Sequence, residues 1–270
     1  MKKEISEMFF LVKRSFDFVS YHLGTNHYHG HGIHSPFLFK MAEEVFNDSP
    51  NRREFEPIEI IRREILNDFT LISGPDHGAG SRRKGKQRTL RNFVRTASIS
   101  PRYGRMLTSL VRFARPERII EWGTGIGIST LYLATAIPSV PVYTVEGNPC
   151  LARKAQAIFN KIGYTNIRSI LGLFEETFHI VFPDEPLPCV FFIDGNHSAR
   201  GTMLIVGKIM NQMHPDSVII LDDIRWSAEM YTTWKKLISR PEVRLSLDLF
   251  SMGIMLFQPS LWKQHFQIRF

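Results

Sequence analysis

The sequence contains few cysteines and no long hydrophobic run. Cys150 and Cys189 are its only cysteines among 270 residues, too few for a disulfide framework or a four-thiolate zinc site. The longest apolar stretch near the start, residues 8–12, ends at two basic residues, and no later run approaches the roughly 20 residues that a membrane span needs. We therefore expect reduced thiols, no signal peptide, no membrane partner and a place in the cytoplasm.

Repeats, low-complexity tracts and an extreme composition are also absent. With 43% hydrophobic and 22% charged residues, the chain has enough apolar material for a packed core. The formal charge of +8 is unevenly distributed, because residues 81–95 contain no acidic residue and hold Arg82, Arg83, Lys84, Lys86, Arg88, Arg91 and Arg95. The rest of the chain is nearly balanced, so the pattern indicates a local anion site or a solvated loop and not general binding to polyanions.

The first part of the chain, residues 1–114, predicts helices separated by irregular loops. Apolar residues recur at helical spacing in residues 4–22, and the Ser-Pro pairs at 35–36 and 100–101 are typical helix starts. Five of the ten histidines lie in residues 22–34, but a glycine-rich loop without cysteine or carboxylate partners favours a lid or a plain loop over a zinc site. We therefore expect a helical cap region with Gly/His-rich and basic loops.

From residue 115 to residue 270, short β-branched or aromatic runs alternate with helical segments. The runs expected to form strands are RIIEW, VPVYTVE, NIRSIL, CVFFID and SVIILD. Parallel strands need helical crossovers, which cover both faces of a sheet, so the pattern predicts an α/β fold with a doubly wound, Rossmann-like sheet. The final runs, VRLSLDLF and MGIMLFQP, predict an antiparallel hairpin at the end of this domain.

The first predicted strand ends in a glycine-rich turn that begins at Glu121. Its glycines let the backbone turn tightly and approach a ligand closely. The dinucleotide fingerprint G-x-G-x-x-G would need glycine where the chain has Ile128, whereas E-x-G-x-G-x-G is complete. Glu146 ends the second strand, 25 residues after Glu121, and a carboxylate there can accept hydrogen bonds from both hydroxyls of an adenosine ribose.

These motifs resemble those of the class I S-adenosylmethionine-dependent methyltransferases, over residues 117–259. The resemblance implies a seven-stranded sheet whose last strand is antiparallel, and S-adenosylmethionine as the cofactor. It implies that the first turn surrounds the methionine part of the cofactor, through Glu121, Gly123, Thr124, Gly125 and Gly127. It also implies that Glu146, with Gly147 beside it, holds the ribose, and that Gly172 and Leu173 lie where the family holds adenine.

Carboxylates end the fourth and fifth predicted strands, at Asp194, Asp222 and Asp223. Neighbouring strand ends converge, and three oxygen ligands suit Mg²⁺ or Ca²⁺. A metal there could lower the pKa of an acceptor hydroxyl, with Asp194 beside the cofactor and His197 taking the proton. The motifs are similar to those of metal-dependent small-molecule O-methyltransferases, although those families carry Asp-Asn or Glu-Asp where this chain has Asp-Asp. Helix caps or pocket walls are equally suitable roles for these acids.

We therefore predict a methyltransferase that transfers a methyl group to oxygen in a small-molecule acceptor, with Mg²⁺ assistance and a helical cap over the acceptor. The basic segment, residues 81–95, predicts either a lid over an acidic acceptor or contact with RNA. Phe93 is its only aromatic residue, which disfavours the base stacking expected of RNA binding. A non-catalytic cofactor-binding module is a further alternative. The amphipathic first helix could serve a homodimer interface as well as the cap.

Overall fold

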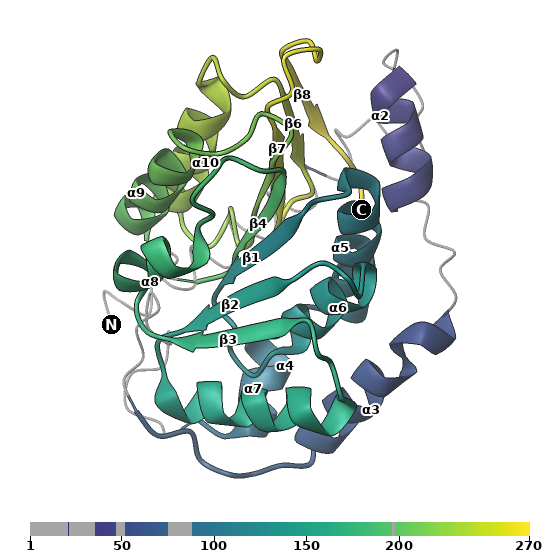
Figure 1. The fold of residues 1–270 in the computed structure, drawn as a ribbon, viewed down its shortest axis with the longest axis vertical. Coiled ribbons are helices and arrows are strands. Elements are labelled where there is room, and N and C mark those ends of the chain that lie inside the picture. Colours follow the sequence, from purple (N-terminus) through teal and green to yellow (C-terminus); the bar gives the residue numbers. More distant parts are fainter. Residues whose placement is uncertain (1–20, 22–35, 47–51, 75–87, 196–197) are drawn as a thin grey trace.

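The structure is a computed structural model that describes residue 21 and residues 36–46, 52–74, 88–195 and 198–270. Within these residues, eight strands form one sheet in the order β3-β2-β1-β4-β5-β7-β6-β8 (Figure 1). The strands are β1 (Arg118–Trp122), β2 (Val142–Glu146), β3 (Ile167–Leu171), β4 (Cys189–Ile193), β5 (Val218–Leu221), β6 (Leu245–Asp248), β7 (Gly253–Leu256) and β8 (Gln264–Gln267). The doubly wound α/β fold predicted from the sequence is confirmed.

One strand of the sheet, β7 of the predicted closing hairpin, runs opposite to the others. Strands β1 to β5 pair in parallel, and β7 lies antiparallel between β5 and β6. The prediction of seven strands is wrong by one, because β8 pairs in parallel with β6 at the edge of the sheet. Its sequence, QHFQ, has a single apolar residue and is exposed or half-buried, so no hydrophobic pattern marks it as a strand. Pairing with β6 in the folded chain, and not the local sequence pattern, makes this segment a strand.

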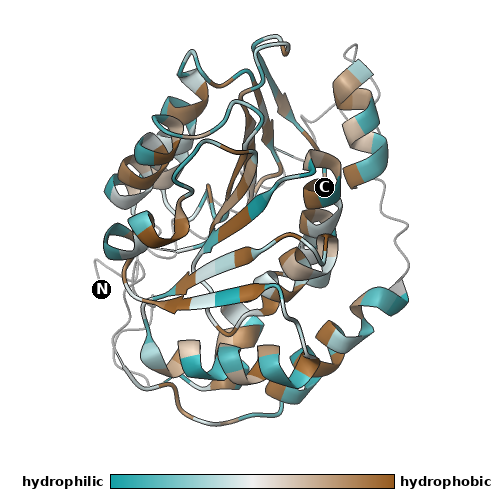
Figure 2. Ribbon diagram, viewed as in Figure 1, coloured by the Kyte–Doolittle hydropathy of each residue, from teal (hydrophilic) through white to brown (hydrophobic). Residues whose placement is uncertain are grey.

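Helices cover both faces of the sheet. One face carries α8 (Phe174–Val181), α9 (Ala199–Met210) and α10 (Ala228–Ser239), and the other carries α5 (Pro101–Ala114), α6 (Ile128–Ala136) and α7 (Pro149–Ile162), as Figure 1 shows. Alternate residues of the central strands enter two separate cores, with Val190 and Phe192 on one face and Phe191 and Ile193 on the other. Figure 2 shows the hydrophobic residues concentrated in these central strands.

Several helix ends follow local sequence signals. Ser100 precedes Pro101 and accepts a hydrogen bond from the Tyr103 backbone N–H at 3.4 Å, so α5 begins where the Ser-Pro pair predicts. In the same way, the Asn148 side chain accepts from two backbone N–H groups of α7, and Gly163 ends that helix in the left-handed conformation, with φ 84°.

The N-terminal helices share a core with the sheet domain. These are α2 (Pro36–Met41), α3 (Glu56–Ile65) and α4 (Leu90–Ala97), with a π-helical turn (Ala42–Phe46) and a 3₁₀ turn (Arg52–Phe55). Tyr132 of α6 is fully buried, packs against Phe55, and donates its hydroxyl to Glu59 of α3. The hydrophobic core is therefore continuous across the boundary expected between residues 114 and 115. In the described part of the chain, no helix is long and apolar enough to cross a membrane.

We predict that Gly104→Ala destabilises the protein, although alanine favours helices. A Cβ at Gly104 would lie 2.4 Å from two ring carbons of the buried Tyr132, and such overpacking costs about 1–3 kcal/mol of the free energy of unfolding. The matched control is Gly207→Ala in α9, where a Cβ meets no atom within 4 Å, so helix propensity should stabilise that variant by up to about 1 kcal/mol. Urea unfolding of both variants would test this, and a stable Gly104→Ala would contradict the packing.

Candidate functional site

The turn after β1 brings the chain across the end of β4. Gly123 has φ 108°, and a Cβ there would lie 2.1 Å from the carbonyl oxygen of Asp194. Gly125, with φ 55°, faces the ring of Phe93, which a Cβ at 125 would approach to 3.0 Å. Both positions therefore need glycine for conformation and for space. The turn places its backbone against the ends of β1 and β4, while α4 of the N-terminal region packs against it.

Glu121 supports this turn from below. Its side chain is fully buried, and its two carboxylate oxygens accept hydrogen bonds from Ser129 at 2.6 Å, Thr130 at 2.5 Å and Thr144 at 2.6 Å. Burial raises the pKa of Glu121, and the three hydroxyl donors oppose that rise. Contact of Glu121 with a cofactor stays a prediction, and in this structure its carboxylate is bound by these three hydroxyl groups. It joins β1, α6 and β2 beneath the turn.

Glu146 lies at the end of β2, partly exposed, beside the same turn. Its carboxylate accepts a hydrogen bond from the Gly125 backbone N–H at 2.7 Å and one from the Asn148 N–H at 2.8 Å. These two donors fix the carboxylate between the glycine turn and the start of α7, next to the half-buried Gly147. Thr124 has its hydroxyl 2.6 Å from that of Thr144, which continues the network to Glu121. The structure thus brings together the residues predicted for the methionine and ribose parts of a cofactor.

The residues that follow β3 lie beside the end of β2. The Gly172 N–H donates to the Glu146 carbonyl oxygen at 3.0 Å, and Leu173 is the residue before α8. The ring of Phe174 lies against Gly195, where a Cβ would be 2.5 Å from its Cζ atom. The three segments after β2, β3 and β4 therefore adjoin each other, as the predicted adenine site requires.

The three predicted metal ligands lie at the ends of β4 and β5. Burial raises the pKa of Asp194 well above 3.8, and the charges of Asp222 and Asp223 raise it further. Asp223 has φ 51°, and its N–H donates to the Asp222 side chain at 2.9 Å. Within residues 21, 36–46, 52–74, 88–195 and 198–270, no group of three His, Cys, Asp or Glu side chains is arranged to hold a metal ion. The acids therefore gather negative charge without forming a metal site on their own.

Some predicted features lie outside the described residues. These are His197, the His-rich segment of residues 22–34, and the basic residues at positions 82–86. Of the remaining basic residues, Arg88 places its guanidinium 4.6 Å from the Phe93 ring centre, and Arg91 lies 5.1 Å from that of Phe69. Two guanidinium planes of this segment are thus covered by aromatic rings.

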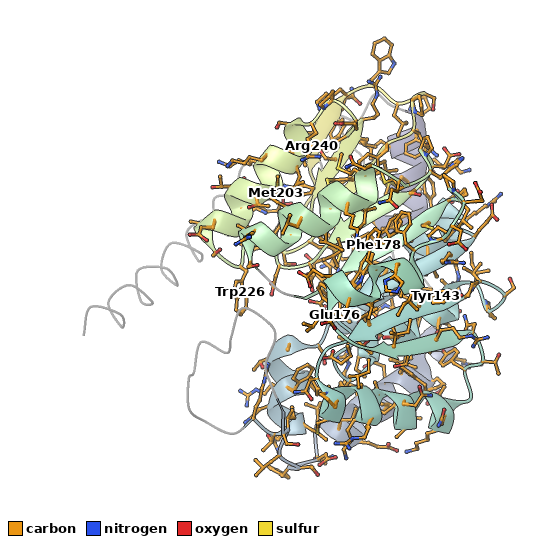
Figure 3. All side chains as sticks on the ribbon, turned by 60° about the vertical axis from the view of Figure 1, so that its left-hand side comes forward. Tyr143, Glu176, Phe178, Met203, Trp226 and Arg240 are labelled. Atoms are coloured by element: carbon orange, nitrogen blue, oxygen red, sulfur yellow. The ribbon has the colours of Figure 1, made fainter. Side chains whose placement is uncertain are left out.

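Sequence reasoning missed the contact that Phe93 makes at the site. Phe93 was considered only as an RNA-stacking residue, whereas it packs on the glycine turn, and its spacing from Leu90 was the available signal for an inward face of α4. Trp226, in the turn after β5, is half-buried and donates its backbone N–H to Asp223 at 2.8 Å. In Figure 3 its ring projects from the end of the α9 and α10 layer.

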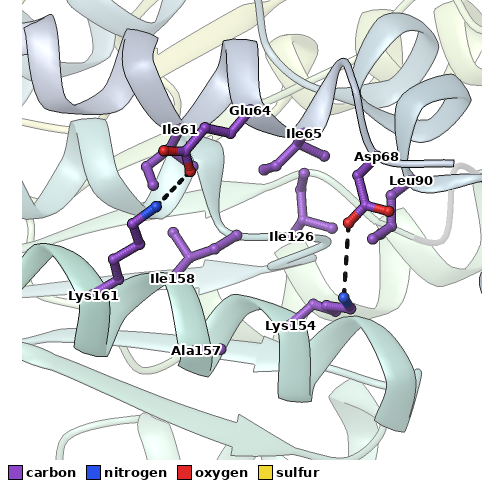
Figure 4. Close-up of a pocket in the computed structure, with 10 residues that line it drawn as sticks. All are labelled: Ile61, Glu64, Ile65, Asp68, Leu90, Ile126, Lys154, Ala157, Ile158 and Lys161. Carbon is purple, nitrogen blue, oxygen red and sulfur yellow. Dashed lines mark hydrogen bonds and ion pairs between the residues drawn. The ribbon is translucent and has the colours of Figure 1, made fainter. Parts of the chain in front are cut away.

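A groove of about 200 Å³ lies behind the glycine turn, between α3 and α7 (Figure 4). Its apolar wall includes Ile126 of the turn, and ion pairs of Lys161 with Glu64 at 2.6 Å and of Lys154 with Asp68 at 3.8 Å cross it. None of the predicted site residues lines it. The groove is therefore separate from the strand ends that gather the candidate site.

Comparison with known proteins supports the class of the site. Residues 120–224 match a family model described as a methyltransferase domain. An O-methyltransferase from Bacillus cereus, solved in complex with SAH, aligns with a TM-score of 0.54 at 16% identity over 80% of this chain and 99% of that one. The O-methyltransferase TomG from Streptomyces achromogenes, in complex with SAM, aligns with a TM-score of 0.52 at 18% identity over 60% and 82%. The SAH-bound methyltransferase PaMTH1 of Podospora anserina aligns with a TM-score of 0.52 at 19% identity over 60% and 80%.

The fold is therefore that of the class I, S-adenosylmethionine-dependent methyltransferases. The matched segment runs from β1 to the turn after β5 and contains the glycine turn, Glu146 and the three aspartates. Residues 120–224 thus match a methyltransferase domain, and the sheet around them has the fold of the aligned methyltransferases.

We predict that Asp194→Asn stabilises the protein at neutral pH. Since burial and the neighbouring carboxylates raise the pKa of Asp194 in the folded chain, its ionisation opposes folding, whereas asparagine stays neutral. The advantage of the variant should be present at pH 7, shrink as the pH falls through the raised folded pKa, and vanish below the unfolded pKa. Urea unfolding at pH 7 and at acid pH would measure it. Asp184→Asn, at an exposed position, is the control, and equal stability of Asp194→Asn and the native chain at pH 7 would contradict the prediction.

Proposed function

We propose that the chain binds S-adenosylmethionine at the ends of β1 to β4 and transfers its methyl group to an oxygen of a small-molecule acceptor. One observation carries this proposal. The partly exposed carboxylate of Glu146 is fixed by the N–H groups of Gly125 and Asn148, so it is oriented before any ligand arrives. A carboxylate held in this way is suited to accept hydrogen bonds from two adjacent ribose hydroxyls.

The remaining contacts follow from the geometry. The half-buried backbone of Gly123 and Gly125 would contact the methionine part, and Gly172, Leu173 and Phe174, beside Glu146 and Gly195, would contact adenine. When bound, S-adenosylmethionine supplies an electrophilic methyl group on a positively charged sulfur. The carboxylates at the ends of β2, β4 and β5 favour a cation in this region. The described residues thus bind and orient the donor beside an acidic acceptor side.

Methyl transfer to a hydroxyl requires alignment of the donor with the acceptor and the removal of the hydroxyl proton. The acceptor oxygen forms a bond to the methyl carbon as the carbon–sulfur bond breaks, and the sulfur leaves as a neutral thioether. Asp194, which lies near Asp222 and Asp223, is one residue that could receive the hydroxyl proton. His197 is the other base that the sequence predicts. Most of the rate enhancement would come from positioning and desolvation.

Magnesium assistance and an acidic acceptor held by residues 81–95 are the finer parts of this proposal. Asp194, Asp222 and Asp223 provide the oxygen donors that Mg²⁺ prefers, although the described side chains do not form a ligand set. A bound acceptor hydroxyl could complete such a set. RNA methylation and cofactor binding without catalysis are alternatives that the experiments below separate.

We predict that Glu146→Gln weakens binding of S-adenosylhomocysteine by about 10- to 100-fold, because a hydrogen bond to a charged group contributes roughly 1.5–3 kcal/mol. Isothermal titration calorimetry would measure the affinity, and thermal unfolding would check that the variant folds. Glu64→Gln, on the exposed face of α3, should bind S-adenosylhomocysteine as the native chain does. Equal affinity of Glu146→Gln and the native chain would contradict the assigned ribose contact.

We further predict that methyl transfer requires Mg²⁺. A screen with labelled S-adenosylmethionine and a panel of catechols, phenols, sugars and hydroxy acids would identify an acceptor, and excess EDTA should then abolish turnover until Mg²⁺ is added. Asp194→Ala and Asp223→Ala should lose both turnover and the response to Mg²⁺. Full activity in EDTA would remove the metal from the proposal and leave the methyl transfer intact. Transfer to RNA alone, lost steeply with salt, would favour the RNA alternative.

A further inference from the structure

A buried ion pair lies directly beside the acidic strand ends. Arg225, in the turn after β5, donates to both carboxylate oxygens of Asp248, the last residue of β6, at 2.6 and 2.7 Å. Their side chains are only 11% and 1% exposed. Desolvating two charges opposes much of their attraction, so such a pair contributes little net stability. Its two-point geometry nevertheless fixes the direction of the arginine side chain.

The pair ties two turns together. Arg225 also donates to the carbonyl oxygen of Phe250 at 2.7 Å, and the Phe250 N–H donates to the Asp248 carboxylate at 2.9 Å. The Ile224 N–H donates to the Ser251 carbonyl oxygen at 2.8 Å. Residues 222–226, which contain two of the predicted acids, are thus bound to the β6–β7 turn through backbone and side chain.

Three aromatic rings surround the guanidinium group of Arg225. Its central carbon lies 4.4 Å from the ring centre of Tyr231, 5.0 Å from that of Phe250 and 5.3 Å from that of Tyr21. These rings come from α10, the β6–β7 turn and the N-terminal part of the chain. Aromatic faces favour a guanidinium cation and exclude water from its ion pair, so the arginine is confined on several sides.

The hydroxyl groups of two tyrosines, Tyr21 and Tyr103, bind the β6–β7 turn. Tyr21 has its hydroxyl 2.5 Å from the Asp248 carbonyl oxygen and 2.8 Å from that of Ile268. Tyr103 of α5 donates to the Leu249 carbonyl oxygen at 2.7 Å. The turn that receives Arg225 is therefore anchored to the N-terminal region and to the C-terminal part of the chain.

The tied turns contain two residues in an unfavourable backbone conformation. Asp223 has φ 51° and Phe250 has φ 70°, in the left-handed region that residues with a Cβ rarely adopt. Such a conformation persists where surrounding contacts determine it. For Asp223, the contacts are the N–H of Trp226, which donates to its carbonyl oxygen at 2.8 Å, and the attachment of the next two residues to the β6–β7 turn.

We propose that Arg225 is a positioning residue for methyl transfer, which holds residues 222–226 against the β6–β7 turn so that the carboxylates of Asp222 and Asp223 stay beside Asp194. This inference rests on the proposed function of these strand ends. A purely structural ion pair would affect stability alone. A positioning role predicts that loss of Arg225 loosens residues 222–226 and lowers the rate of methyl transfer. The affinity for the cofactor should not change, because Glu146 and the glycine turn make no contact with Arg225 in the interactions described above.

The test compares Arg225→Met, Arg225→Lys and the double variant Arg225→Met/Asp248→Asn with the native chain. The double variant removes both charges, so it leaves no unpaired buried ion and is expected to fold, and asparagine can still accept from the Phe250 N–H. Arg168→Met, at an exposed position of β3, is the matched control. Hydrogen exchange of residues 222–227, calorimetry with S-adenosylhomocysteine, and kcat with the acceptor found in the screen are the readouts.

In Arg225→Met and the double variant, we expect faster exchange in residues 222–227 and a kcat lowered by about tenfold or more, as misplacement near reacting atoms can cost. Affinity for S-adenosylhomocysteine should stay within about twofold, since these contacts lie elsewhere. Arg225→Lys should recover part of kcat, because it restores the charge but not the two-point contact. Unchanged exchange and kcat in the folded double variant would overturn the inference.

Failure of the proposed function would give a different result. A native chain that binds no S-adenosylhomocysteine and methylates no acceptor would remove the proposed function. Exchange of residues 222–227 would still report on Arg225 in that case: faster exchange in both variants supports its hold on the turn, and unchanged exchange contradicts it.

Discussion

The arrangement of the strand ends depends on the hydrogen bonds that the buried carboxylate of Glu121 accepts. A carboxylate removed from water needs donors for its oxygens, and Ser129, Thr130 and Thr144 supply them from α6 and β2. The glycine turn must therefore leave β1 in the one direction that brings Ser129 and Thr130 back over Glu121. That direction carries the turn past Asp194 and beside Glu146, where its N–H at residue 125 fixes the second carboxylate.

On the proposed acceptor side, a buried carboxylate is again paired with hydrogen-bond donors, but here the donor is an arginine. At the ends of β1 and β2, hydroxyl and backbone donors satisfy the buried or half-buried carboxylates, whereas at the end of β6 a guanidinium group satisfies Asp248. Hydroxyl and backbone donors leave the local charge negative, which suits a cationic donor molecule. The guanidinium group of Arg225 offsets the charge of Asp248, so the carboxylates of Asp222 and Asp223 remain to meet the proposed acceptor. Both halves of the candidate site therefore contain carboxylates, and that of Asp248 is paired with an arginine.

The features that could be predicted from the sequence are those that depend on residues close together in the chain. Glycines at 123, 125 and 127, a carboxylate at the end of β2 and the Ser-Pro helix start at 100–101 each depend on neighbouring residues, so the sequence displays them directly. The role of Glu121, the edge strand β8 and the pair of Arg225 with Asp248 depend on residues brought together by the fold. No pattern near Arg225 in the sequence indicates a partner in β6, 23 residues away. The segment QHFQ pairs with β6 because the fold brings the two segments together, and not because of its own sequence pattern.

The formal charge of +8 describes the chain but not its site. The described part of the site gathers Glu121, Glu146, Asp194, Asp222 and Asp223 closely enough that the other four raise the pKa of Asp194. Two basic residues of the 81–95 segment, Arg88 and Arg91, lie on aromatic rings of the N-terminal region. A cation at the strand ends would relieve the repulsion among these acids, and the sulfonium of the donor is such a cation. In the proposed reaction, the same field would attract the cationic sulfonium but not the neutral thioether product, so the charge of these carboxylates would favour binding of the donor over its product.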